Sequence, residues 1–207
     1  MTVEAVIFDC DGTLVDSETL AASVIVEILA EHGAVASYDE ILAAFRGGKF
    51  ANFVSGLCAR FPQLDADDFS LCFRERSITV FEADLQPIPG AVELVRNLKL
   101  DRCVASNGPR KKIETSLRAT GLLPFFNNRI VSAYEIGCWK PDPQLIWSAT
   151  KLMSVDPQRC LLVEDSVAGI EAGLAAGVQV IGFRLDDAAR ARFGAQVRVI
   201  DDLSDVP

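Results

Sequence analysis

The sequence of 207 residues has a single histidine, no Cys-x-x-Cys pair and no apolar run long enough to span a bilayer. One histidine excludes the zinc motif His-Glu-x-x-His and any other site that needs two imidazoles. That residue, His32, stands in Glu-His-Gly and is expected at a helix end, facing solvent. Basic residues are also few, since 20 Lys and Arg stand against 29 Asp and Glu and give a net charge of −9. We therefore expect no binding to nucleic acid or to an anionic membrane surface.

The six cysteines, at positions 10, 58, 72, 103, 138 and 160, lie mostly inside apolar segments. This pattern is typical of reduced cysteines in an intracellular protein. The first residues run directly into a charged segment that contains aspartate, unlike a signal peptide. The sequence therefore predicts a cytoplasmic protein, and its half share of apolar residues predicts a globular one.

Short apolar segments alternate with helical patterns in most of the chain. Residues 2–8 are β-branched and apolar, which is typical of a strand buried on both faces. From residue 91 onward helices are expected before strands in four successive pairs, at 91–98 and 103–106, 110–119 and 129–132, 143–153 and 160–163, and 167–176 and 178–183. Such alternation predicts an α/β protein with a parallel sheet covered by helices on both sides.

A long helical segment interrupts this alternation after the first strand. A helix is expected from Ser17 to His32, and residues 38–83 look entirely helical because their apolar positions recur every three or four residues. The sequence therefore predicts a core domain of residues 1–15 and 85–207 and an inserted, all-helical domain of residues 16–84.

Two acidic residues follow the first strand. Asp9 and Asp11 flank Cys10, and in an extended chain both carboxylates would face the same side. Open α/β sheets bind ligands at the carboxyl ends of their strands, and a pair so placed can divide the roles of nucleophile and acid or base. Gly12 permits a turn and close approach of the backbone. A turn with two solvated aspartates is the equally weighted alternative.

A second acidic pair, Glu164-Asp165, follows the buried segment Cys-Leu-Leu-Val. Four carboxylates at one edge would repel one another, and a hard dication with oxygen ligands, most simply Mg²⁺, would relieve the repulsion. The alternative is that these acids only favour the N-terminus of the next helix.

Two further polar residues have the right surroundings for an anion site. Ser106 ends a strand in Ser-Asn-Gly-Pro, where its hydroxyl and the N–H of Asn107 face the start of a helix. Lys140 lies in Trp-Lys-Pro-Asp-Pro, a stiff loop that could aim the lysine at a phosphate or a carboxylate. Taken alone, the serine could be an ordinary helix cap and the lysine a solvated side chain.

The order of these motifs resembles that of the haloacid dehalogenase-like (HAD) superfamily of phosphatases and phosphomutases. The resemblance covers nearly the whole chain and implies a Rossmann-like core with a helical cap inserted after the first motif. It implies that Asp9 is the nucleophile, that Asp11 is the acid and base, and that Ser106 and Lys140 hold the phosphoryl oxygens.

The resemblance also implies a Mg²⁺ site. Asp9, the carbonyl of Asp11 and Asp165 would be its ligands, with Glu164 either a ligand or a partner of the ligands. Phosphoryl transfer needs positioning and charge neutralisation, which a metal, a lysine and backbone N–H groups can supply.

Several residues around the motifs are candidates for binding substrate. They are Gly12, Glu18, Arg46, Lys49 and Asn107. For Arg46 and Lys49, in the basic glycine turn Arg-Gly-Gly-Lys, two solvated charges on a turn are an equal alternative. Ser17 and Glu18 could contact substrate hydroxyls or cap the first cap helix.

Two departures from the family's patterns narrow the expected reaction, and two sequence strings narrow the expected substrate. The β-phosphoglucomutase branch carries a cap histidine and an arginine at places that here hold Ala21 and Phe50, which favours hydrolysis over mutase activity. Ser-Asn-Gly-Pro and Trp-Lys-Pro-Asp-Pro resemble the strings of the family's 6-phosphogluconate phosphatases. The family's dehalogenases need only the first aspartate of the motif. The presence of Asp11 therefore disfavours dehalogenation.

The sequence therefore predicts a Mg²⁺-dependent phosphatase acting on a small phosphorylated metabolite, a sugar or sugar-acid phosphate, and working as a monomer or weak homodimer. The alternatives are a phosphosugar mutase and a non-enzymatic phospho-acceptor signalling module. A signalling module would differ from this chain in having its acceptor aspartate mid-chain and no helical insertion.

Overall fold

In the computed structural model, residues 2–45 and 49–207 are described, and they contain one sheet of six parallel strands. The strand order is β3-β2-β1-β4-β5-β6, which places the first strand of the chain at the centre. The strands are β1 (Ala5–Phe8), β2 (Asp101–Ser106), β3 (Ile130–Ser132), β4 (Cys160–Glu164), β5 (Gln179–Phe183) and β6 (Arg198–Ile200).

Strand β1 is buried on both faces, as its apolar sequence predicts. Val6 and Phe8 belong to the hydrophobic core on one side of the sheet, whereas Ala5 and Ile7 belong to the core on the other. The strand begins at Ala5 and not at Thr2, because Ala5 is the first residue with partners in both β2 and β4.

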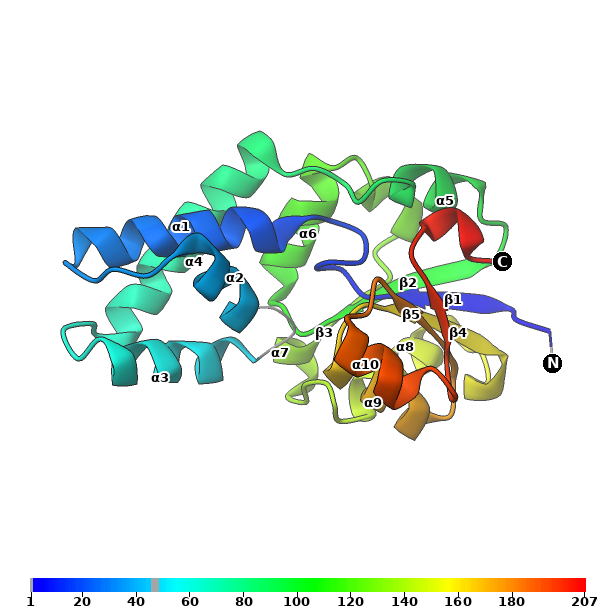
Figure 1. The fold of residues 1–207 in the computed structure, drawn as a ribbon. Helices are drawn as coiled ribbons and strands as arrows, with labels where there is room; N and C mark the ends of the chain where they lie inside the picture. Colours follow the sequence, from blue (N-terminus) through cyan, green and yellow to red (C-terminus); the bar gives the residue numbers. More distant parts are fainter. Residues whose placement is uncertain (1, 46–48) are drawn as a thin grey trace.

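Helices cover both faces of this sheet (Figure 1). Helices α5 (Ala91–Asn97) and α6 (Arg110–Ala119) contribute to the core that contains Phe8. Helices α8 (Gln144–Met153), α9 (Val167–Ala176) and α10 (Asp187–Phe193) contribute to the core that contains Ile7. The predicted α/β, Rossmann-like parallel sheet with helices on both sides is confirmed.

Four helices between β1 and α5 lie together beyond the carboxyl ends of the strands (Figure 1). They are α1 (Ser17–Glu31), α2 (Tyr38–Phe45), α3 (Phe50–Arg60) and α4 (Ala66–Asp84). The segment is not helical throughout, because a turn follows Arg60 and α4 starts only after Asp65, whose carboxylate accepts hydrogen bonds from the N–H groups of Asp67 and Asp68. Aromatic contacts hold the helices together; Phe50, for example, stacks on Phe73 with ring centroids 5.0 Å apart.

The sequence pattern missed several short elements. These are α7 (Ala133–Ile136), α10, β6 and the 3-10 helices η1 (Leu123–Phe126), η2 (Pro157–Arg159) and η3 (Leu203–Asp205). Segments of three to seven residues span too few periods to show a helical or strand repeat. None of the helices in the described ranges combines the length and apolar character that crossing a membrane requires.

The six cysteines are all free. Cys10, Cys103 and Cys160 are buried, and the other three are partly buried. Burial raises the pKa of the Cys160 thiol to about 11, which keeps it protonated and unreactive.

Candidate active site

Asp9 meets the second acidic pair because β1 and β4 are neighbours. Phe8 pairs with Val163 in the parallel register, so Asp9 follows β1 beside Glu164, the last residue of β4, and Asp165. Oxygen atoms of Asp9, Glu164 and Asp165 all lie within 4.8 Å of one another. The structure thus brings Asp9 together with two carboxylates that lie about 155 residues further along the sequence, at the edge where parallel sheets bind ligands.

Lys140 lies buried among these carboxylates. Its ammonium donates hydrogen bonds of 2.6 Å to Asp9 Oδ1 and 2.6 Å to Glu164 Oε2, and its side chain is 2% exposed. The backbone N–H of Lys140 donates to Asn107 Oδ1 at 2.8 Å, which ties the lysine loop to the end of β2. A solvated Lys140, one of the sequence alternatives, is therefore wrong.

One ammonium cannot neutralise three carboxylates. Burial, followed by the charge of Glu164, raises the pKa of Asp9 to about 8 in spite of Lys140. Burial and the charges of Glu164 and Asp9 raise the pKa of Asp165 well above its ordinary value. The pKa of Lys140 is also raised: burial lowers it, but the attraction of Asp9 and Glu164 outweighs this effect. The cluster therefore has an excess of negative charge that favours a bound cation.

Glu164 is held by hydrogen bonds on both oxygens. Its Oε1 accepts from the N–H groups of Asp165 and Ser166 and from the Ser166 hydroxyl, at 2.9–3.1 Å, while Oε2 faces Lys140. Ser166 also caps α9, since its Oγ accepts from the N–H of Gly169 at 3.0 Å. A Cβ on Gly169 would overlap the Glu164 side chain, so glycine is required there. The alternative that these acids only stabilise the N-terminus of α9 is incomplete, because Glu164 also pairs with Lys140.

Asp11 faces a different partner from Asp9. Its carboxylate accepts from the ammonium of Lys112, on α6, and from the hydroxyl of Ser17, at the start of α1. Burial would raise the pKa of Asp11, but the charge and hydrogen bond of Lys112 and the hydrogen bond of Ser17 lower it overall. Ser17 therefore binds Asp11 and does not cap α1. The carboxylate of Asp11 lies outside the three-carboxylate group, whereas the resemblance assigns the metal only its carbonyl.

The chain turns tightly after Asp11. Gly12 has φ +81°, and the Asp165 carboxylate occupies the space that a Cβ would need. The hydroxyl of Thr13 donates to Asp165 Oδ1 at 3.1 Å. The predicted close approach at Gly12 is therefore to the carboxylate of Asp165.

Ser106 ends β2 and is buried, and it lines the same cavity as Asp9 and Lys140. Its Oγ accepts from the N–H of Gly108 at 3.1 Å, which leaves the hydroxyl proton for a ligand. The structure thus places Ser106 beside the acidic cluster.

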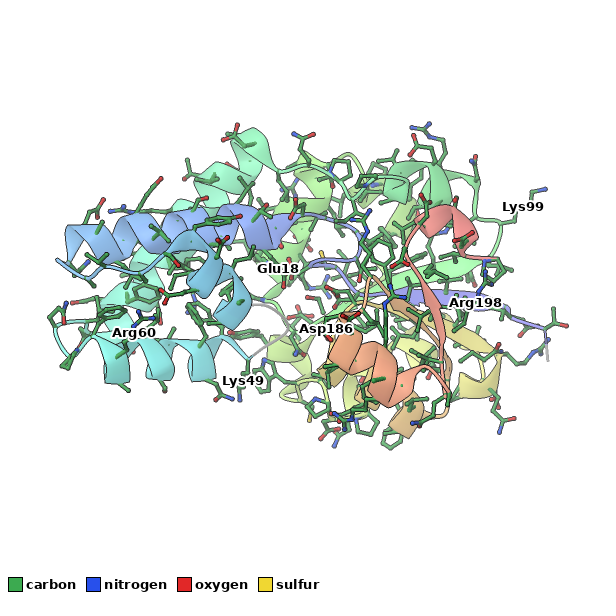
Figure 2. The ribbon with its side chains drawn as sticks, viewed as in Figure 1. Glu18, Lys49, Arg60, Lys99, Asp186 and Arg198 are labelled. Carbon is green, nitrogen blue, oxygen red and sulfur yellow. The ribbon has the colours of Figure 1, made fainter. Side chains whose placement is uncertain are left out.

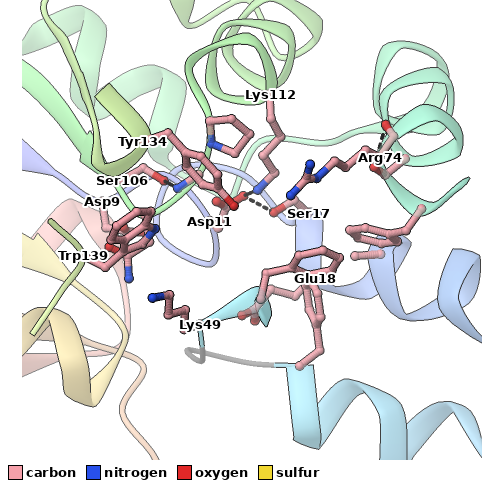
Figure 3. A pocket seen from close by; sticks show the side chains of 18 of the residues that line it. Asp9, Asp11, Ser17, Glu18, Lys49, Arg74, Ser106, Lys112, Tyr134 and Trp139 are labelled. Atoms are coloured by element: carbon pink, nitrogen blue, oxygen red, sulfur yellow. Dashed lines mark hydrogen bonds and ion pairs between the residues drawn. The ribbon is translucent and has the colours of Figure 1, made fainter. Parts of the chain in front are cut away.

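A cavity of about 520 Å³ joins this cluster to the inserted helices (Figure 3). Glu18 and Lys49 line it from the helical segment, as do Ala21 and Phe50. The ammonium of Lys49 lies 4.5 Å from the centroid of the Trp139 ring, which belongs to the lysine loop. Arg46 lies outside the described residues.

Sequence reasoning missed several residues of the cavity. Lys112 is the third residue of α6, in the basic run Arg-Lys-Lys, and this run directly after Ser-Asn-Gly-Pro was a usable signal. Trp139, which precedes Lys140 in Trp-Lys-Pro-Asp-Pro, also lines the cavity, as do Arg74, Phe81 and Tyr134, which no local pattern distinguishes from other helix residues.

Comparison with known proteins gives concordant matches. A model of the haloacid dehalogenase-like hydrolase family matches residues 3–177. A relative from Escherichia coli K12, named 6-phosphogluconate phosphatase, is 34% identical over 206 residues, which cover 99% of this chain and 93% of that protein.

Two solved structures extend the likeness to the whole fold. A haloacid dehalogenase-like protein from Agrobacterium tumefaciens has a TM-score of 0.84 at 31% identity, over 99% of this chain and 96% of that one. A HAD family hydrolase from Deinococcus radiodurans R1, solved with bound phosphate and sodium, has a TM-score of 0.80 at 31% identity, over 99% and 93%.

Proposed function

The chain belongs to the haloacid dehalogenase-like hydrolase family, and from this premise we propose that it is a Mg²⁺-dependent phosphatase that forms an aspartyl-phosphate on Asp9. We further propose a small phosphorylated metabolite, a sugar or sugar-acid phosphate, as its substrate. The proposal includes the division into a core of residues 1–15 and 85–207 and a cap of residues 16–84, with the substrate bound between them.

The observation that carries the proposal is the position of Asp9. Its carboxylate lines the cavity at the carboxyl end of the central strand, and Lys140 donates to it at 2.6 Å. A carboxylate so placed can attack phosphorus, provided that it is ionised. Its raised pKa means that ionisation at neutral pH needs more positive charge than Lys140 alone supplies.

The donor set fits a magnesium ion. Carboxylate oxygens from Asp9, Asp165 and Glu164 lie within 4.8 Å of one another, and hard oxygen ligands without nitrogen or sulfur are those that Mg²⁺ prefers. Asp9, Asp165 and the carbonyl of Asp11 would hold the ion, and Glu164 would either ligate it or orient Lys140. When bound, the ion supplies positive charge that keeps Asp9 ionised and offsets the charge of the phosphoryl group.

The reaction divides into two steps on this chain's residues. Asp9 forms a bond to phosphorus as the bond to the ester oxygen breaks, and protonated Asp11 gives its proton to the leaving oxygen. Asp11 then takes a proton from water, which attacks phosphorus and releases phosphate and the Asp9 carboxylate. The first step leaves Asp11 ionised, and the contacts with Lys112 and Ser17 that lower its pKa stabilise this form, which is the base of the second step.

Polar groups from other elements bind the phosphoryl oxygens. The Ser106 hydroxyl and the Lys140 ammonium would donate to them, and donors held in place before the reaction stabilise the charge that develops. Asn107 fixes the backbone of Lys140 and thereby its reach. Gly12, Glu18 and Lys49 would contact the rest of the substrate, together with Arg46.

The residues that line the cavity favour hydrolysis over mutase activity. Ala21 and Phe50 both line it, and neither can exchange a proton or bind a phosphate. The single histidine, His32, lies at the end of α1, where its Nδ1 contacts the carbonyl oxygen of Ile28 at 2.8 Å. Water is therefore the proposed acceptor of the phosphoryl group.

The comparisons support the substrate class. The E. coli relative is named for hydrolysis of a phosphorylated sugar acid, and the Deinococcus structure holds phosphate. By the same proposal the protein acts in the cytoplasm, on a small molecule, as a monomer or weak homodimer.

A phosphate-release screen tests the proposal. The purified protein with Mg²⁺ is offered p-nitrophenyl phosphate, sugar phosphates, sugar-acid phosphates and nucleotides. We expect continuous turnover of a small set, and Asp9→Asn should lower kcat by on the order of a thousandfold or more. Asp205→Asn removes an exposed carboxylate of η3 that does not line the cavity and should leave turnover unchanged.

Three results would contradict the proposal. Unchanged turnover in Asp9→Asn would exclude the covalent step. Labelling of the protein without turnover would favour a signalling module. Transfer of phosphate to a second position of the sugar, in place of its release, would favour a mutase.

A further inference from the structure

Arg74, on α4, carries a positive charge into the cavity and has no carboxylate partner within residues 2–45 and 49–207. Its side chain is exposed and lines the cavity, and Figure 3 shows it extending from α4 into that space. Two other arginines of the helical segment do pair with acids: Arg60 with Glu40 at 3.4 Å, and Arg76 with Glu31 at 2.6 Å. Among the described residues, no ion pair involves Arg74.

An aromatic stack supports this arginine. Its guanidinium carbon lies 5.8 Å from the centroid of the Phe50 ring, and that ring stacks on Phe73 at 5.0 Å with an angle of 23° between the planes. Phe73 is buried in the core of the helical segment. A ring face positions a guanidinium without neutralising it, so the charge remains available to an anion.

The two lysines beside the acidic cluster already have carboxylate partners. Lys140 is bound to Asp9 and Glu164, and Lys112 is bound to Asp11. Arg74 comes from a different wall, on the helical segment, which Phe45, Phe50 and Phe73 line together with Glu18, Lys49 and Glu75. A neutral polyol would form only ordinary hydrogen bonds with the guanidinium, whereas an anion would form the stronger, charge-assisted ones.

We propose that Arg74 binds a second negatively charged group of the substrate, a carboxylate or a second phosphate, and so makes the enzyme select phosphate esters with an anion at the far end. Its planar fork can form two parallel hydrogen bonds to either group. This inference rests on the proposed phosphatase function, and it names a specificity residue that the sequence motifs do not include.

A matched pair of substrates tests it. 6-Phosphogluconate and glucitol 6-phosphate are both open-chain and differ only at C1, which is a carboxylate in the first and a CH2OH group in the second. The wild-type enzyme should have the higher kcat/KM for 6-phosphogluconate. Arg74→Gln should lower that value by roughly tenfold to a hundredfold, the range for losing a hydrogen bond to a charged group. For glucitol 6-phosphate the change should stay within about threefold, since no charged contact is lost.

A second pair, fructose 1,6-bisphosphate and fructose 6-phosphate, tells a second phosphate from a carboxylate as the bound group. The inference holds if the anionic member of either pair loses activity selectively in Arg74→Gln. Arg60→Gln is the control, because Arg60, at the end of α3 (Figure 2), is not among the residues that line the cavity. It removes the same charge from the helical segment and should leave both pairs unchanged. Glutamine is a good helix former, so the exposed position should tolerate it.

The remaining outcomes separate the two proposals. Equal losses on charged and neutral substrates would mean that Arg74 contacts the reacting phosphate, and this result would overturn the inference. No loss on either pair would overturn it as well, while hydrolysis of p-nitrophenyl phosphate that depends on Asp9 would leave the phosphatase function standing. Failure of the wild-type protein to hydrolyse p-nitrophenyl phosphate and every member of both pairs would overturn both proposals.

Discussion

Without metal, the protein should be more stable at pH 6 than at pH 8, because Asp9 holds a proton more tightly in the folded chain. Burial and the charge of Glu164 raise its pKa to about 8, whereas an aspartate in an unfolded chain has a pKa of about 3.9. A carboxyl group with a raised folded pKa stabilises the folded state below its unfolded pKa, and that stabilisation is lost as the pH rises through the folded pKa. The affected window therefore runs from about pH 4 to about pH 8.

The size of the effect follows from the same two pKa values. Each pH unit within the window changes the free energy of unfolding by about 1.4 kcal/mol. Between pH 6 and pH 8 the free energy of unfolding falls by about 2 kcal/mol. This is less than twice the change for one pH unit, because Asp9 is already half ionised at pH 8. Asp165, whose pKa is also raised, acts in the same direction. A bound cation favours the ionised carboxylates, so Mg²⁺ should reduce the loss.

Urea unfolding at pH 6, 7 and 8 measures this dependence, in EDTA and in excess Mg²⁺. Asp9→Asn is the matched control, since the amide has nearly the same shape but cannot ionise. In EDTA, the free energy of unfolding of this variant should change between pH 6 and pH 8 by about 2 kcal/mol less than that of the wild-type protein. The reasoning is refuted if the wild-type protein and the variant lose stability equally between pH 6 and pH 8.

Three further changes test the site. Lys140→Met should cost about 3–5 kcal/mol in urea unfolding, because it leaves the carboxylates of Asp9 and Glu164 buried without their cation; stability equal to that of the wild type would contradict the pairing. Gly169→Ala should lower both stability and phosphate release, because its Cβ would overlap the Glu164 side chain. The control Gly56→Ala, on α3 with open space around it, should instead stabilise the protein by about 0.5–1 kcal/mol. Equal effects of the two substitutions would refute the steric argument. Chelation with EDTA should abolish phosphate release and added Mg²⁺ should restore it; activity that survives exhaustive chelation would exclude the metal.

The fold could be predicted from the sequence because its signals are local. The apolar segment ending at Phe8 shows a strand buried on both faces, and the alternation of strands and helices after residue 85 shows the parallel sheet. The convergence of Asp9 and Asp165 could also be predicted, because strands that are parallel end at the same edge. Short elements such as β6 escaped because three residues contain no complete repeat.

The family resemblance implied that Lys140 offsets the charge of Asp9, but the partner of Asp11 could not be predicted, because it depends on packing between distant segments. Lys140 and Lys112 both follow loops that look equally exposed in the sequence, yet one contacts Asp9 and the other Asp11. The reason is geometric: Asn107 ties the Lys140 loop to β2, whereas Lys112 reaches Asp11 from the first turn of α6. The two pKa shifts have opposite directions: burial and the charge of Glu164 raise the pKa of Asp9 in spite of Lys140, whereas Lys112 and Ser17 lower that of Asp11. The surroundings that make the two carboxylates of the Asp-x-Asp motif different are therefore fixed only when β4, α6 and the lysine loop pack around them.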